Sequence, residues 1–177
     1  MSTVDDVDAA WAALAADFAL DRPEDASGAA LETLRAGLVA AFTAAGVADA
    51  ADRVGLPAQY ARFLTLAGGT WHHVHPDETP ADIPYQMHFY GAGGALSATE
   101  IESDLHVEDR VPDASLWLIF GHWSDKHLLL LNCDRGDPGF GTVIDAHDDH
   151  PWLGGANDVV ADSFAGYLRH LREDWDS

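Results

Sequence analysis

The sequence predicts a domain in which α-helices pack on a β-sheet. Three short apolar runs, at residues 117–121, 126–132 and 141–145, are separated by polar turns and predict strands. A polar loop follows, and residues 161–171 then place apolar side chains at helical spacing. Three strands and a closing helix in this order limit the fold to a sheet with helices.

The first 55 residues are expected to be helical. Apolar side chains recur at intervals of three and four residues from Val4 to Phe18, which predicts a helix that residues 22–28 interrupt. A second alanine-rich stretch carries Leu31, Leu34 and later apolar positions on one stripe. We therefore expect residues 1–55 to form a helical N-terminal extension that packs on a main domain of residues 56–177.

The main domain is expected to open with a helix at Leu56 and Pro57. Proline is favoured in the first helical turn, because its missing N–H would have no partner there. Gly68 and Gly69 are expected to end this helix, since glycine adopts the left-handed C′ conformation without steric cost.

The next segment is expected to contain two strands, a turn and a helix. Residues 70–74 and 85–90 suggest short strands, and the glycines of residues 91–94 suggest a sharp turn. Ser97 and Glu100 have the spacing of a capping box, which predicts a helix from Ser97 to about residue 108.

Alternation in the strands and the stripes of the helices together predict the core. The residues expected to meet in one cluster are Leu118, Phe120, Val143, Phe164, Leu168 and Leu171, with Tyr60, Phe63 and Leu64.

The charge balance restricts the possible partners. The chain has nine Lys and Arg residues and thirty Asp and Glu residues, which give a formal net charge of −21. Nucleic-acid binding and anionic membrane surfaces both call for basic residues, so neither is expected. Two interpretations stay open: the charge serves solubility, or it attracts a basic protein partner.

The expected location is the cytoplasm. The chain has a single cysteine, Cys133, which excludes an internal disulfide framework. No signal peptide and no transmembrane segment is expected from the sequence pattern.

No catalytic or metal-binding pattern is complete. His72, His73 and His75 lie close together in the sequence, and His88 follows later. In a strand, His73 and His75 would share one face and His72 would point to the other. The imidazoles are therefore expected to lie in a polar loop, without a metal or cofactor. Cys133 lies beside Asp134, an acidic setting that does not activate a thiol. The expectation is a protein that is not an enzyme.

An acidic run near the C-terminus resembles a known metal motif. Residues 145–150 (Asp-Ala-His-Asp-Asp-His) are similar to the His-x-His-x-Asp-His signature of metallo-β-lactamase-like hydrolases, with Asp145 in place of the first histidine. That fold places the signature early, whereas only one helix follows it here. A metal-dependent hydrolase is therefore a remote alternative, and a solvated acidic loop is the simpler interpretation.

The same run is the predicted contact region for a protein partner. Its acids can steer a basic protein, and exposed tryptophans are enriched in binding hot spots. The predicted partner-binding residues are Asp145, Asp148, Asp149, Trp152 and Trp123.

Several segments between about residues 56 and 171 together match the pattern of one known family. They are the Leu-Pro helix of residues 56–64 with its Gly68-Gly69 end, residues 94–97 and 100–101, the strands at 118–121 and 128–132, Gly141-Thr142-Val143 with His147, and residues 160–164 with Tyr167-Leu168. In these segments the chain resembles the SUKH superfamily, which includes a fungal cell-wall assembly regulator and many bacterial immunity proteins.

The resemblance implies an α+β fold, a mainly antiparallel sheet with packed helices, and no shared catalytic residues. It also implies a binding protein, in bacteria often one that neutralises a toxin such as a nuclease by direct contact. We therefore expect a non-catalytic immunity protein with a basic partner. The alternative is a regulatory or scaffolding module, and the adjacent gene would discriminate the two, because an immunity gene normally follows its toxin.

Overall fold

The computed structural model describes residues 4–74, 87–105, 116–123, 127–147 and 158–175. The helices are α1 (Asp5–Leu14), α2 (Gly28–Ala44), α3 (Ala50–Arg53), α4 (Ala58–Ala67), α5 (Ala92–Leu105) and α6 (Phe164–Trp175), with a 3₁₀ turn at Ala15–Asp17. The strands are β1 (Phe18–Pro23), β2 (Gly69–His73), β3 (Met87–Phe89), β4 (Trp117–Trp123), β5 (His127–Asn132), β6 (Val143–His147) and β7 (Asp158–Ala161). Within this described part, no helix is both long and apolar enough to cross a membrane.

The seven strands form one antiparallel sheet in chain order, β1 to β7. The α+β class with a mainly antiparallel sheet is thus confirmed. β3 pairs only with the second half of β4, from Gly121 to Trp123. The first half of β4 lies next to α5 instead, and Thr99 of α5 accepts a hydrogen bond from the backbone N–H of Ile119 at 3.0 Å.

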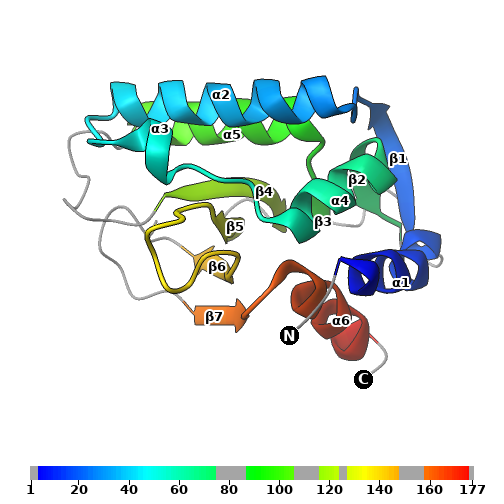
Figure 1. Cartoon of the computed structure of the whole chain (residues 1–177). Helices are drawn as coiled ribbons and strands as arrows, with labels where there is room; N and C mark the ends of the chain where they lie inside the picture. Colours follow the sequence, from blue (N-terminus) through cyan, green and yellow to red (C-terminus); the bar gives the residue numbers. More distant parts are fainter. Residues whose placement is uncertain (1–3, 75–86, 106–115, 124–126, 148–157, 176–177) are drawn as a thin grey trace.

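The helices form two groups (Figure 1). α1 packs against both α4 and α6, and these three helices contribute to the main core. α2 and α5 lie side by side, with α5 along β4.

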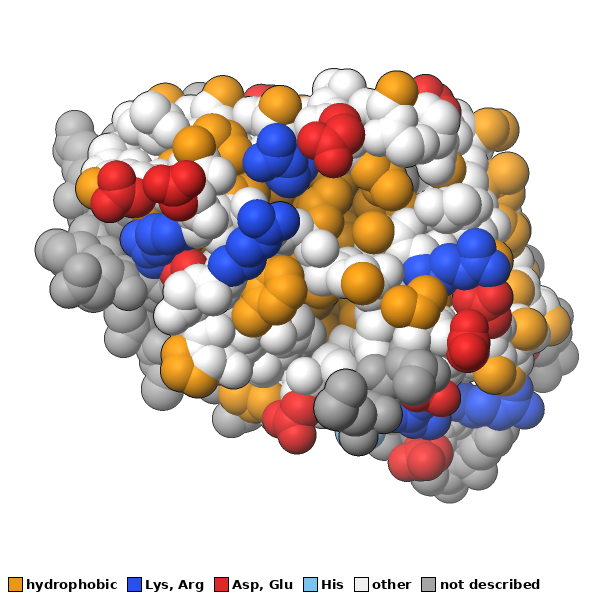
Figure 2. All heavy atoms as spheres, in the orientation of Figure 1, with side chains coloured by type: hydrophobic (Ala, Val, Ile, Leu, Met, Phe, Trp, Pro, Cys, Tyr) orange, Lys and Arg blue, Asp and Glu red, His pale blue; other side chains and the backbone are white. Residues whose placement is uncertain are grey.

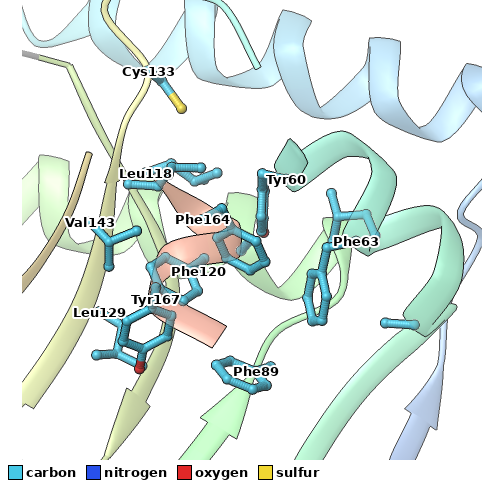
Figure 3. Packing of buried hydrophobic residues seen from close by; sticks show 14 of the residues in the cluster. Tyr60, Phe63, Phe89, Leu118, Phe120, Leu129, Cys133, Val143, Phe164 and Tyr167 are labelled. Atoms are coloured by element: carbon cyan, nitrogen blue, oxygen red, sulfur yellow. The ribbon is translucent and has the colours of Figure 1, made fainter. Parts of the chain in front are cut away.

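The predicted core is confirmed in full, and Phe164 lies near its centre (Figure 3). The Phe164 ring centroid is 4.9 Å from that of Phe63, 5.1 Å from that of Tyr60 and 5.3 Å from that of Phe120. The face of the sheet that carries Leu118, Phe120 and Val143 is called the core face below.

The opposite face of the sheet has a smaller apolar cluster. Because side chains alternate along a strand, Ile119, Leu130 and Ile144 point away from the core face, and Ala146 joins them. His72, His88 and His122 lie on this same side by their pairing, so it is called the histidine face.

The N-terminal segment contains helices that pack on the core, as predicted, but the prediction that it is helical throughout was wrong. The first helix ends at Leu14, and Phe18 lies in β1, where it pairs with His73 of β2. The segment expected to be a helical extension therefore contributes an edge strand to the sheet. Trp11 also packs into the main core, with its ring 5.0 Å from that of Phe63.

The predicted start of α5 was also wrong, whereas the predicted end of α4 is confirmed. α5 begins at Ala92, so Ser97 lies inside the helix and does not cap it. The carboxylate of Glu24, distant in sequence, binds the first free N–H groups of α5 instead. Gly68 ends α4 in the left-handed conformation, at φ 65°.

Candidate functional site

Asp145 and Trp123, two of the predicted contact residues, lie together on the core face. Asp145 lies in β6 two residues after Val143, so alternation points its side chain toward the core face. One carboxylate oxygen accepts a hydrogen bond from Trp123 Nε1 at 2.8 Å, and the other lies 3.0 Å from His127 Nδ1. The Trp123 and His127 rings stack with centroids 3.9 Å apart. Asp145 is therefore a half-buried, positioned carboxylate and belongs to a strand.

A cavity of about 240 Å³ opens beside this carboxylate, under α6. We call it the α6 pocket, and its lining residues are Met87, Trp123, Leu129, Asp145, Val160, Tyr167, His170 and Leu171. The Tyr167 hydroxyl is buried and has no hydrogen-bond partner among the described residues. Burial, together with the negative charge of Asp145, raises the pKa of Tyr167, so the phenol stays protonated.

A larger cleft of about 910 Å³ lies between β1, α2 and α5, at the edge of the histidine face. Leu34, Leu96 and Ile101 supply apolar surface, and Ile101 is 56% exposed. Asp21 and Asp25 are exposed where the chain leaves β1. The α2–α5 cleft thus combines an apolar wall with an acidic end.

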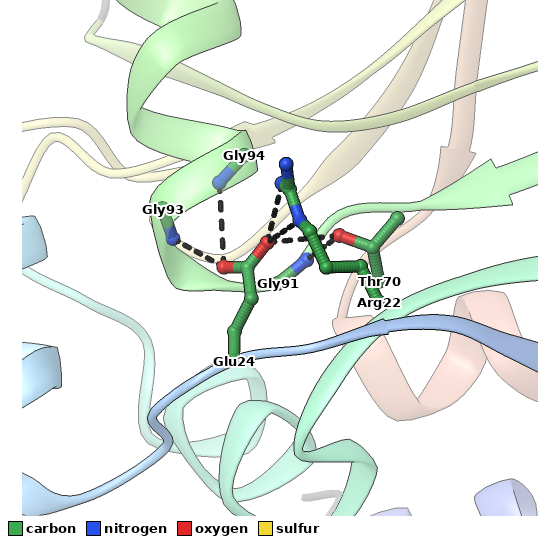
Figure 4. A network of polar contacts seen from close by, with 6 residues as sticks. All are labelled: Arg22, Glu24, Thr70, Gly91, Gly93 and Gly94. Carbon is green, nitrogen blue, oxygen red and sulfur yellow. Dashed lines mark hydrogen bonds and ion pairs between the residues drawn. The ribbon is translucent and has the colours of Figure 1, made fainter.

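Glu24, which also lines this cleft, has a structural role (Figure 4). One oxygen accepts hydrogen bonds from the backbone N–H groups of Gly93 at 2.7 Å and Gly94 at 3.4 Å. The other pairs with Arg22 at 2.6 Å and accepts from the Thr70 hydroxyl at 3.1 Å. Partial burial opposes ionisation, but these hydrogen bonds outweigh it and lower the pKa of Glu24. A negative charge at this end of α5 also suits the helix dipole.

Three histidines lie in register across β2, β3 and β4. His72 pairs with His88, and His88 pairs with His122, whose ring stacks on that of His88 at 4.6 Å. The Tyr90 hydroxyl lies 2.6 Å from His122 Nδ1. Burial lowers the pKa of His88 and neighbouring His72 lowers it further, while Asp21 acts in the opposite direction. Over the residues described, no group of three or more His, Cys, Asp or Glu is arranged to hold a metal.

Of the predicted contact residues, Asp148, Asp149 and Trp152 lie outside the described residues. Cys133 is buried, and burial raises the pKa of its thiol.

Residues that the sequence analysis missed are His127, Tyr167 and His122. A signal for the first two was present, because Asp145 and Val143 share one face of a strand, and an inward-facing acid needs polar neighbours.

Comparison with protein-family models, curated proteins and solved structures gives no match for this chain. The SUKH resemblance therefore stays a prediction.

Proposed function

We propose that the protein is a non-catalytic binding protein for a basic partner protein, and that it acts as an immunity protein by covering a toxin. The charge distribution carries this proposal. Four arginines are paired with carboxylates: Arg22 with Glu24, Arg35 with Glu32, Arg53 with Asp134, and Arg62 with Asp8. On the face seen in Figure 2, basic side chains accordingly lie beside acidic ones.

Many other acids are exposed. In the described ranges the exposed acidic residues outside these four pairs are Asp5, Asp17, Asp21, Asp25, Asp49, Asp52, Glu100, Asp162 and Glu173. A surplus of exposed acids gives the surface a negative potential, which speeds association with a basic protein and orients it.

The proposed contact surface is the α2–α5 cleft. Asp21 and Asp25 at its end supply charge complementarity, and Ile101 supplies exposed apolar surface that a partner can bury. The contact region predicted from the sequence is instead the acidic run with Asp148, Asp149 and Trp152, and the experiment below separates the two places.

The test uses the purified product of the gene next to this one, because an immunity gene normally lies beside its toxin. We expect a basic protein whose activity is inhibited and whose association rate falls at least about tenfold between low and high salt. A regulatory module would instead leave its partner's activity intact. Association that is insensitive to salt would contradict the proposal.

Three double variants locate the contact by removing charge at different places. Asp21→Asn with Asp25→Asn should slow association several-fold. Asp148→Asn with Asp149→Asn removes the same amount of charge from the acidic run, and Trp152→Ala tests its aromatic anchor through the dissociation rate. Asp49→Asn with Asp52→Asn, at α3, is the matched control and should change the rate least. A larger effect in the Asp148/Asp149 variant would move the contact to that run.

A further inference from the structure

We propose that the α6 pocket binds an alkyl cation, that is, an ammonium or guanidinium group on an aliphatic stem. The pocket is separate from the α2–α5 cleft, and the inference does not rest on the proposed protein partner. Its volume of about 240 Å³ exceeds the roughly 150 Å³ of a cavity that holds benzene but is smaller than most drug-sized sites. That size fits a group as large as a lysine or arginine side chain.

Asp145 supplies the charge that a cation needs. Among the described residues that line the pocket, Asp145 is the sole carboxylate and none is Lys or Arg. Its two oxygens each have one described contact, to Trp123 Nε1 and to His127 Nδ1. A carboxylate offers about four lone-pair sites, so capacity is left for ligand donors. The two existing contacts fix the side chain in place and reduce the ordering needed on binding.

Tyr167 supplies a second polar group without a partner in the described structure. Its hydroxyl is fully buried, and a buried polar atom that lacks a hydrogen bond is unfavourable. The ring lies against Phe120 and Leu129 under α6 (Figure 3). An ammonium donates up to three hydrogen bonds, so a cation bound by Asp145 still has donors, and the Tyr167 hydroxyl oxygen is an acceptor on a residue that lines the same pocket.

The rest of the lining suits the stem of the ligand. Leu129, Val160 and Leu171 are aliphatic, and a methylene chain packed on them leaves water.

Other ligand classes fit these residues less well. An anion would meet the charge of Asp145 in a protein that is already strongly acidic. A neutral apolar molecule would offer no donors to Asp145 and would take water away from its carboxylate.

The direct test is an NMR titration of the full chain with n-butylammonium and n-propylguanidinium at pH 8, where ordinary imidazoles are neutral. The indole N–H of Trp123 is the reporter, since it is bonded to Asp145, and a Trp123→Phe variant identifies its signal. We expect saturable shifts with a dissociation constant of roughly 1–10 mM, the range for so small a ligand. Sodium chloride at equal ionic strength, n-butanol and butyrate should give no saturable shift.

Variants test the two polar groups. Asp145→Asn should weaken butylammonium binding by roughly tenfold to a hundredfold, and Tyr167→Phe by roughly threefold to tenfold. Asp162→Asn removes the same charge from an exposed residue that does not line the pocket, and should leave the affinity within about twofold. Thermal melts check that each variant is folded, and Tyr167→Phe tests the proposal even if Asp145→Asn unfolds, because the ring is kept.

A second ligand distinguishes the two possible sources of the cation, a side chain of another protein and a free small molecule. The peptide acetyl-Gly-Lys-Gly-amide should shift the same Trp123 signal if the pocket receives a side chain from another protein. If only the free amines bind, the natural ligand is a small molecule. The proposal is overturned if neither cation gives a saturable shift, if n-butanol binds as well as butylammonium, or if both pocket variants bind like the unmodified protein.

Discussion

The two faces of the sheet use the same alternating strands for different purposes. The core face carries the large aromatic cluster around Phe164 and packs under α1, α4 and α6. The histidine face has an apolar cluster of four buried residues, a row of three histidines and the edge of a wide cleft. This contrast indicates that stability resides mainly on the core face, where the α6 pocket is the one opening described above, while the histidine face borders a wide cleft.

The largest expected effect comes from the core face. Phe164 is 1% exposed and touches four other aromatic rings, so Phe164→Ala should lower the free energy of unfolding by about 3–5 kcal/mol. Phe140→Ala is the matched control at a 38% exposed ring and should cost about 1 kcal/mol or less. Urea denaturation followed by circular dichroism measures both. Equal costs would mean that the aromatic cluster does not dominate stability.

A smaller effect is expected where α5 meets the open half of β4. The buried Thr99 hydroxyl accepts from the Ile119 N–H and donates to the Ala95 carbonyl. Thr99→Val keeps the shape but leaves that N–H without its acceptor, which should cost about 1–3 kcal/mol.

Thr43→Val is the control for this change. Thr43 also donates to a carbonyl one helical turn back but is exposed on α2, so its replacement should change stability by less than about 0.5 kcal/mol. Similar urea midpoints for the two valine variants would show that the β4 edge does not depend on Thr99.

The elements that the sequence predicts well are those with strong local patterns. The strands around residues 118–120 and 128–131 are apolar runs bounded by turns, and α4 has both a proline start and a glycine end. β1 lacks such a pattern, because Ala19, Asp21 and Arg22 show no apolar alternation. It exists through pairing with β2, some fifty residues later, and a local reading cannot detect that pairing.

In the candidate site, too, local patterns could be predicted from the sequence and long-range contacts could not. Asp145 and Trp123 stood out because an acid and a large aromatic lie beside predicted turns. Their contact depends on the register of β4, β5 and β6, and the pocket exists only once α6 brings Tyr167 over Leu129. The start of α5 was misassigned for a similar reason, since its capping carboxylate comes from Glu24 and not from a residue next to it.

Replacing Glu24 is expected to lower the free energy of unfolding by about 1 kcal/mol, and the size of this effect should depend on pH. Its pKa is lowered in the folded protein, so the stability it adds is present above the usual carboxyl pKa and is lost as the pH falls through the folded value. Glu24→Gln should therefore cost about 1 kcal/mol at pH 7, and the difference from the unmodified protein should shrink toward pH 3. Urea unfolding at several pH values measures this.

The control for Glu24 is Glu32→Gln, at an exposed residue of α2 whose pair with Arg35 is at the surface. It should cost no more than about 0.5 kcal/mol. A Glu24→Gln cost that does not change with pH would show that shape, and not charge, determines the start of α5.

The smallest expected effect belongs to His88 on the histidine face. Its pKa is lowered by burial and by His72, so the unfolded chain binds a proton more readily than the folded one. The free energy of unfolding should therefore increase as the pH rises through the usual histidine range, and it should be smaller at pH values below that range. In His88→Gln this rise should be weaker, by less than about 1 kcal/mol between pH 5 and 7.5. An NMR titration of the His88 ring should give a midpoint below that of a free imidazole. A midpoint at or above it would mean that Asp21 outweighs burial, and that the histidine face is as open to water as the cleft beside it.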